Sequence, residues 1–139
     1  MQLLTDADRA LLEKYPLYSQ DNKKAEAVVI LKYFLPGTAA TWYVLEGSPE
    51  EYEAEGGGTY EDITFFGYVE GIVEGGEEYG YFTLKQLEEI EVKVPVIING
   101  KESGALPCKV EKDLYLREGI TIGELVPAVR ELWKDSAEE

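Results

Sequence analysis

The chain has 139 residues, of which 45% are hydrophobic and 29% charged, so it can bury a core and is not wholly disordered. Asp and Glu outnumber Lys and Arg by 28 to 13, and the net charge of −15 argues against direct binding to nucleic acid or anionic lipid. Histidine is absent and Cys108 is the one cysteine. Ser-His-Asp triads, Cys-His pairs, an internal disulfide and a cysteine-rich zinc site are therefore excluded.

The N-terminal segment does not read as a signal peptide, because Asp6, Asp8 and Arg9 interrupt its apolar residues. No apolar run approaches the length that spans a bilayer. A single free thiol fits a reducing compartment. We therefore expect one domain over residues 1–139, without membrane association and located in the cytoplasm.

The first part of the chain predicts a capped helix followed by two strands. The helix begins after Thr5, whose hydroxyl can accept hydrogen bonds from the first-turn amides, and ends at Tyr15-Pro16. Residues 27–35 are β-branched, aromatic and almost continuously apolar, and 41–46 have the same character. Because Pro36-Gly37 turns the chain between them, we expect the two strands to pair as a hairpin.

An acidic stretch with three consecutive glycines follows at 47–60. It has little apolar surface to bury, which predicts a mobile loop. Residues 63–73 then resume strand character, and 78–82 can return antiparallel to them. Thr83 can cap a short helix over 84–90, whose leucines and isoleucine recur at helical spacing.

The last part of the chain predicts a hairpin, a strand and a helix. Residues 92–98 are rich in β-branched side chains, and Asn99-Gly100 favours a tight hairpin turn. A final strand is expected over 109–116, and Thr121 can cap a C-terminal helix that Pro127 either kinks or restarts. The fold class is therefore α+β, with a mainly antiparallel sheet of about five or six strands and N-terminal, middle and C-terminal helices.

Several short motifs follow one another in a characteristic order. They are Leu3-Leu4-Thr5, Pro16-Leu17-Tyr18, Lys32-Tyr33-Phe34, Thr41-Trp42-Tyr43, Phe65-Phe66-Gly67-Tyr68-Val69, Glu78-Tyr79-Gly80-Tyr81-Phe82-Thr83-Leu84, Leu87-Glu88 and Glu111-Lys112-Asp113-Leu114-Tyr115. Their order resembles that of the DUF2958 family and covers most of the chain. The resemblance implies a small protein of a kind commonly carried on plasmids and other mobile elements, in a family without an assigned enzymatic activity. Residues 47–60 and an inserted hairpin at 92–109 depart from the family pattern.

Negative charge is concentrated between residues 46 and 91, which hold fourteen acidic residues and one basic residue, Lys85. Such a field would attract a basic partner and weaken with salt. Two interpretations stay open: a solvated surface that keeps the protein soluble, or a mimic of a nucleic-acid backbone that occupies the basic groove of a DNA- or RNA-binding protein. The candidate partner-binding residues are Glu50, Glu51, Glu53, Glu55, Asp62, Glu70, Glu74, Glu77, Glu78, Tyr79 and Tyr81.

Aromatic side chains recur on the predicted strands. Alternation along a strand would point Tyr43 away from Trp42, and Tyr79 and Tyr81 away from Phe82, so that tyrosine hydroxyls share one sheet face. These tyrosines either pack in the core or contact a partner, since aromatic residues are favoured in interfaces.

The alternative to partner binding is a small enzyme or ligand-binding domain that uses carboxylates and tyrosines in a pocket. Asp62, Glu70, Glu78, Glu111 and Asp113 flank predicted strands, but their spacing selects no acid–base pair. No phosphate-loop or complete calcium-loop pattern is present, so we expect no nucleotide cofactor and no metal. The leading hypothesis is a non-catalytic accessory protein of mobile-element type. It would bind a basic, DNA- or RNA-binding protein and inhibit a host defence or nucleic-acid-processing enzyme.

Overall fold

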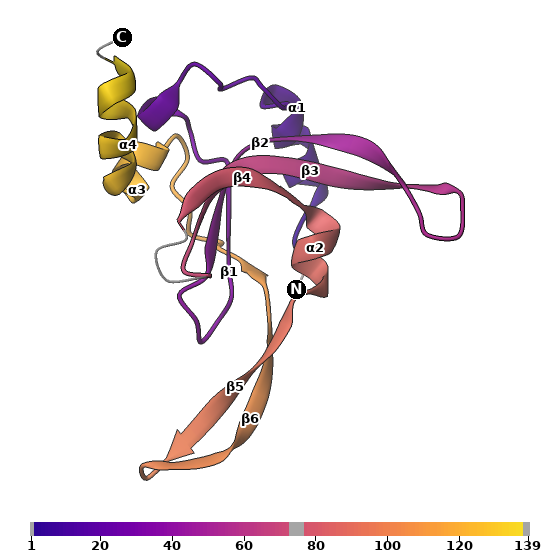
Figure 1. Ribbon diagram of the computed structural model, residues 1–139, viewed down its shortest axis with the longest axis vertical. Helices are drawn as coiled ribbons and strands as arrows, with labels where there is room; N and C mark the ends of the chain where they lie inside the picture. The colour runs from indigo at the N-terminus through magenta and orange to yellow at the C-terminus, as the bar shows by residue number, and fades with distance from the viewer. Residues whose placement is uncertain (1, 73–76, 138–139) are drawn as a thin grey trace.

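The computed structural model describes residues 2–72 and 77–137, which adopt an α+β fold (Figure 1). The helical elements are α1 (Asp6–Lys14), the short 3-10 helix η1 (Lys24–Glu26), α2 (Leu84–Glu89), α3 (Ile122–Leu125) and α4 (Ala128–Ala137). The strands are β1 (Leu31–Phe34), β2 (Thr41–Glu53), β3 (Thr59–Glu70), β4 (Glu78–Thr83), β5 (Glu91–Ile98), β6 (Lys101–Lys109) and β7 (Glu111–Lys112).

The strands form one large and one small antiparallel sheet. The large sheet has five strands in the order β4-β3-β2-β1-β7, and the small sheet is the pair β5-β6. The predicted fold class, a mainly antiparallel sheet with N-terminal, middle and C-terminal helices, is confirmed. Within the described ranges, no helix is long and apolar enough to cross a lipid bilayer.

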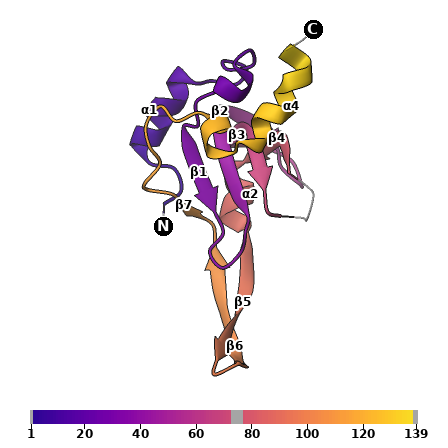
Figure 2. The same cartoon turned by 90° about the vertical axis from the view of Figure 1, so that its left-hand side faces the viewer.

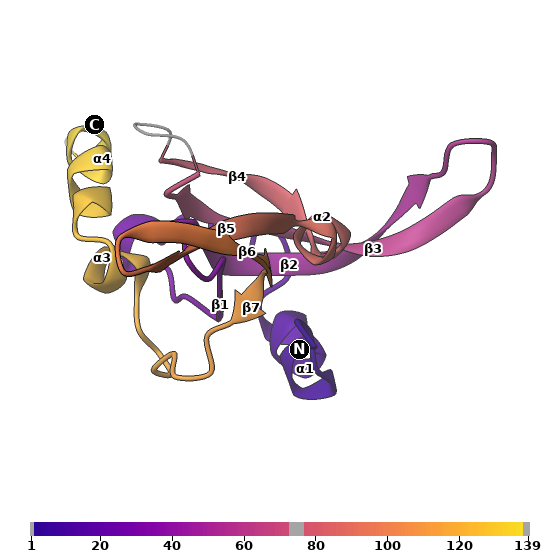
Figure 3. The ribbon, with the colours of Figure 1, turned by 90° about the horizontal axis from the view of Figure 1, so that it is seen from below.

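Different helices cover the two faces of the large sheet. Leu12 of α1 and Leu87 of α2 belong to a core cluster that includes Phe65 of β3. Val129 of α4 belongs to a second cluster on the other face, with Tyr68 of β3. Figure 3 shows that α4 and the outer end of the β2–β3 ribbon lie at opposite ends of the molecule. One face of the sheet is thus closed by α1 and α2, and the other only towards its α4 end.

Three helices begin at the predicted caps. The hydroxyls of Thr5, Thr83 and Thr121 each accept a hydrogen bond from the backbone N–H three residues on, and that third residue's side chain bonds back to the threonine N–H. The C-terminal helix ends at Leu125 and begins again at Ala128. Pro127 therefore restarts the helix, which is one of the two predicted outcomes.

Two strands are shorter than predicted because their flanking residues bond elsewhere. The backbone N–H of Val29 donates to the Ile120 carbonyl at 2.8 Å, so the chain before β1 pairs with the segment leading into α3. After β7, the Asp113 carboxylate accepts from the Tyr115 N–H at 2.8 Å. This Asx-type turn ends the strand that was expected to reach residue 116.

The prediction of a mobile loop over 47–60 is wrong. β2 and β3 pair continuously out to Glu53 and Thr59, and a turn closes the ribbon between them. The Tyr52 and Tyr60 rings stack across the two strands with centroids 5.8 Å apart, which supplies the apolar contact that the composition conceals. The three glycines all have positive φ and form the turn itself. We name residues 50–62 the acidic arm (Figure 1).

The hairpin predicted at 92–109 is confirmed. Asn99 and Gly100 have φ angles of 51° and 79°, as a tight hairpin turn requires. The inner end of the hairpin is anchored, because Val92 and Cys108 pack against the core cluster under α1 and α2. Its outer part projects away from the large sheet (Figure 2). We name residues 91–109 the β5–β6 hairpin.

A buried carboxylate organises the segment between α1 and η1. Glu46 is 2% exposed, and its two oxygens accept from the backbone N–H groups of Tyr18 at 2.8 Å and Gln20 at 2.7 Å. The Gln20 side-chain amide in turn donates to the carbonyls of Val28 and Leu45. Glu46 opens the acidic stretch of the sequence, but it stabilises the interior and offers no surface charge.

Candidate functional site

Within residues 2–72 and 77–137, the acidic arm is a two-stranded ribbon with no further strand beside it. β4 pairs with β3 only from Thr64 onwards, and β1 reaches only the first residues of β2. The ladder of the arm runs from Glu50 opposite Asp62 to Glu53 opposite Thr59. The carboxylates that the arm exposes to solvent are those of Glu50, Glu51, Glu53, Glu55 and Glu61.

None of these exposed carboxylates forms an ion pair with a lysine or arginine of the described residues. Arg9 of α1 and Lys85 of α2 line the same groove as Glu61, and the Lys85 ammonium lies 4.3 Å from the centroid of the Tyr60 ring, a cation–π contact. At about 3.3 Å of rise per residue, the arm carries roughly one negative charge per 3 Å of its length. Duplex DNA carries one per about 1.7 Å of its axis, so the arm has about half that density.

The pairing of the arm places like charges directly opposite each other. Glu51 faces Glu61 across the ladder, and Glu50 faces Asp62. Side chains in such positions have Cβ atoms about 4.5–5.5 Å apart, and two like charges at that distance lower the stability of the sheet. The arm therefore keeps an electrostatic arrangement that weakens its own fold, unless a positively charged surface neutralises it.

Asp62 differs from the other carboxylates of the arm. It is buried, and one of its oxygens accepts from the backbone N–H of Ile63 at 2.8 Å and of Lys85 at 3.1 Å. The second bond satisfies a free amide in the first turn of α2, close to the positive end of that helix. Asp62 thus attaches α2 to the root of the arm and is not available to a partner in this conformation.

The structure separates the remaining predicted acidic residues from the arm. Glu70 ends β3 and Glu78 begins β4, at the end of the ribbon opposite the arm, and Glu77 precedes β4. Glu77 and Glu78 are exposed, whereas Glu70 is half-buried. Glu74 lies outside the described residues. The predicted set therefore divides into two groups, about 30 Å apart along β3 at the usual rise per residue.

The tyrosines share a sheet face, as alternation predicted. The Tyr43 hydroxyl donates to Glu70 at 2.7 Å, and burial together with this carboxylate raises its pKa. The Tyr79 hydroxyl accepts from the Trp133 indole N–H of α4 at 2.9 Å. Tyr79 is thus half-buried under a helix, whereas Tyr81 is exposed. The contact with Trp133 was not predicted, because nothing in the sequence places α4 over β4.

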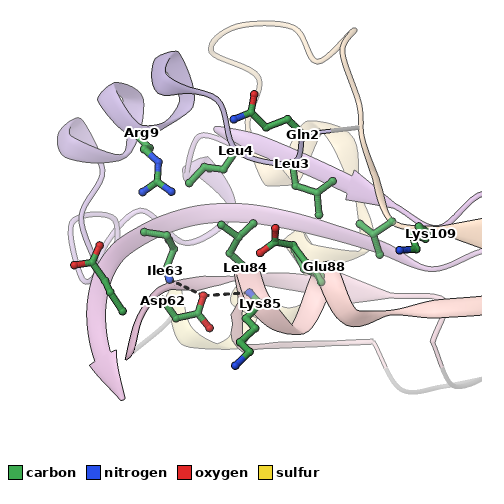
Figure 4. A pocket seen from close by; sticks show the side chains of 13 residues that line it. Gln2, Leu3, Leu4, Arg9, Asp62, Ile63, Leu84, Lys85, Glu88 and Lys109 are labelled. Atoms are coloured by element: carbon green, nitrogen blue, oxygen red, sulfur yellow. Dashed lines mark hydrogen bonds between the residues drawn. The ribbon is translucent and has the colours of Figure 1, made fainter. Parts of the chain in front are cut away.

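A groove of about 600 Å³ lies where the N-terminal segment, α2, the root of the acidic arm and the end of β6 meet (Figure 4). Its apolar floor includes Leu4, Ile63 and Leu87. Charges of both signs line it: Arg9, Lys85 and Lys109 on one hand, Glu61, Asp62 and Glu88 on the other. Asp62 is committed to two backbone amides and no tyrosine lines the groove, so it offers no tyrosine–carboxylate constellation for acid–base chemistry.

The described residues contain no group of three carboxylate or thiol side chains placed to hold a metal ion. Comparisons with protein-family models, with curated proteins and with solved structures give no match to this chain.

Proposed function

We propose that the protein is a non-catalytic accessory protein that binds a basic, DNA- or RNA-binding protein through its acidic arm. The arm would enter the partner's nucleic-acid groove as a mimic of a phosphate backbone. The resemblance to the DUF2958 family suggests a mobile-element setting, in which the partner would be a cytoplasmic host defence or nucleic-acid-processing enzyme that the protein inhibits.

One observation carries this proposal: Glu51 lies opposite Glu61 in a ribbon that has no other strand beside it among the residues that the structure describes. A surface whose only task is solubility gains nothing from opposed like charges, because the same net charge can be spread over unpaired positions. A basic groove, in contrast, would turn this repulsion into attraction on both sides of the ribbon. The arm supplies closely spaced charge on a regular backbone, which a groove that reads phosphates recognises.

The arm's shape supports the same function. A two-stranded ribbon is narrow, since the major groove of DNA accepts an element of this size. The arm can therefore enter a groove on a protein that is wide enough to bind a nucleic acid. Because the root of the arm is held by Asp62 and α2, its base is fixed relative to the sheet. The exposed carboxylates would then be presented without much additional ordering on binding.

The test is affinity capture from a cell lysate with the tagged full chain. The arm variant replaces Glu50, Glu51, Glu53 and Glu55 with glutamine, which removes four charges and keeps the side-chain shape. The matched control neutralises four exposed acidic residues outside the arm: Glu13, Asp21, Glu89 and Glu118.

We expect the wild-type chain and the control to retain a basic protein that duplex DNA releases. The arm variant should retain at least tenfold less of that protein. An equal loss of captured protein in both variants would mean that binding depends on net charge alone. Equal retention in both would leave the arm as a solubilising surface. Either result would overturn the proposal.

A further inference from the structure

Aromatic side chains follow one another along the face of the large sheet that α4 covers only in part. Tyr68 of β3 belongs to the core cluster on the α4 side, and alternation along β3 places Phe66 and Tyr60 on the same face. Tyr79 and Tyr81 of β4 lie opposite Tyr68 and Phe66. We name these five residues the aromatic band. It runs from α4 towards the acidic arm over about 26 Å, at the usual rise per residue (Figure 3).

The rings at the α4 end and in the middle of the band contact one another. The Phe66 ring stacks on Tyr79 with centroids 5.9 Å apart, and its centroid lies 5.0 Å from that of Tyr81. The Tyr79 ring also meets the Trp133 ring of α4, at 5.5 Å between centroids. Such pairs hold the rings in place before any ligand arrives. A ligand that binds on this surface therefore pays little for ordering its side chains.

The middle of the band is open to solvent in the described structure. Tyr81 is 58% exposed, and Tyr18, from the segment between α1 and η1, is 65% exposed. The Tyr18 backbone N–H donates to Glu46, which lies opposite Phe66, so Tyr18 adjoins the band from the β2 side. Partial burial and then the neighbouring Tyr18 hydroxyl raise the pKa of Tyr81. Two tyrosine rings therefore lie side by side at the surface.

Carboxylates lie at both ends of the band. At the arm end, Glu50 shares the face of Tyr52, whose ring stacks on Tyr60. At the α4 end, burial and then the carboxylates of Glu70 and Glu77 raise the pKa of Tyr68, which shows that their charge acts on this face.

One ring of the band already carries a cation. The Lys85 ammonium lies 4.3 Å from the centroid of the Tyr60 ring. Among the described residues, no lysine or arginine lies in this way over Tyr18 or Tyr81. These two rings are therefore open to a cation from another molecule.

The chemistry of this surface favours arginine. A guanidinium can stack its plane on a tyrosine ring while its N–H groups donate to a carboxylate. A lysine ammonium has the same charge but is more strongly hydrated and has no plane to stack. Aromatic sheet faces also bind single-stranded nucleic acid, but the net charge of −15 argues against a phosphate-bearing ligand here.

We propose that Tyr18 and Tyr81, beside Phe66, form a site for arginine side chains of the basic partner, next to the acidic arm. This inference rests on the proposed function, because the arginines belong to the protein whose groove the arm enters. It adds a preference: the segment that contacts the sheet is rich in arginine rather than lysine. The arm supplies attraction to any positive charge, and the two tyrosines distinguish between side chains of equal charge.

Isothermal titration calorimetry of the full chain with acetylated hexa-arginine and hexa-lysine amides tests this preference, because the two peptides carry the same charge. In 150 mM NaCl, we expect hexa-arginine to bind more tightly by a factor of about five or more. In Tyr18→Leu/Tyr81→Leu, this factor should fall below about two, since both rings are lost. The matched control Tyr115→Leu removes a ring that is 94% exposed outside the band, and it should keep the wild-type preference.

A second pair of substitutions separates the rings from their hydroxyls. Tyr18→Phe/Tyr81→Phe keeps both rings and should keep the preference for hexa-arginine. Both double variants leave the backbone N–H of Tyr18 available to Glu46, and far-ultraviolet circular dichroism checks that they fold. In NMR spectra of the wild-type chain, hexa-arginine should shift the ring signals of Tyr18 and Tyr81 more than that of Tyr115.

The arm variant with four glutamines distinguishes this inference from the proposed function. It should weaken the binding of both peptides and keep the preference for hexa-arginine. Unchanged affinity for both peptides would contradict the role of the arm, whereas a retained preference would still support the arginine site. Equal affinity of the wild-type chain for the two peptides would overturn the arginine site. So would a preference that the leucine pair leaves unchanged or that the phenylalanine pair abolishes.

Discussion

Replacing Glu51 with lysine is expected to stabilise the fold while weakening binding by the acidic arm. Glu51 faces Glu61 directly. At about 5.5 Å and the dielectric constant of water, two like charges repel by roughly 0.8 kcal/mol. Screening over a Debye length of about 8 Å halves this value. Reversing one charge replaces a repulsion of about 0.4 kcal/mol by a similar attraction, for a gain of about 0.5–0.8 kcal/mol before the entropy of ordering the side chains.

Urea unfolding followed by tryptophan fluorescence measures this gain as a higher midpoint at an unchanged slope. The matched control is Glu55→Lys, which makes the same charge change in the turn, where the ladder provides no opposite residue. It is expected to give less than half the gain. In 1 M NaCl, where the Debye length is about 3 Å, both gains should fall to about a third of these values. A lower stability for Glu51→Lys, or a gain that is undiminished in 1 M NaCl, would refute the electrostatic reasoning.

Three further predictions concern the interior. Glu46→Gln should lower the free energy of unfolding by about 2–4 kcal/mol in urea titrations, since the new amide NH₂ must face one of two backbone N–H donors. Gly67→Ala should abolish cooperative unfolding, because its Cβ would overlap the backbone carbonyl oxygen of Tyr43. Stability should fall as the pH rises above about 10, because tyrosines ionise there in the unfolded chain whereas burial raises the pKa of Tyr33 and Tyr43 in the folded one. Tyr43→Phe should reduce this pH dependence of the free energy of unfolding, measured by urea titration at each pH. Absorbance at 295 nm follows the ionisation of the tyrosines in the same samples.

Local patterns predicted the elements that local chemistry determines. Thr83 caps α2 because a threonine followed three residues later by glutamine satisfies two backbone amides within the same turn. Asn99-Gly100 forms the hairpin turn because these residues tolerate positive φ. The lengths of β1 and β7 were not predictable in this way, since the Val29 N–H bonds to Ile120, more than 90 residues away.

The acidic arm shows why composition misled the prediction for 47–60. Glutamates and glycines have low strand propensity, but Tyr52 and Tyr60 stack only when the register brings them together, and no local pattern fixes that register. Asp62 and Glu46 were both counted as charge in the acidic stretch. Their oxygens in fact bond to backbone amides that lie far away in the sequence, at Lys85 and Gln20. Sequence reasoning thus located the charge but not the subset of carboxylates that faces solvent.

The central claim is that the acidic arm and a nucleic acid compete for one basic surface. The most direct measurement is a titration of the captured partner, bound to labelled duplex DNA, with the full chain at several fixed DNA concentrations. Competition predicts that the chain concentration needed for half-displacement rises in proportion to the DNA concentration, and that the four-glutamine arm variant does not displace the DNA. A ternary complex of chain, partner and DNA, or displacement that is independent of the DNA concentration, would contradict the account.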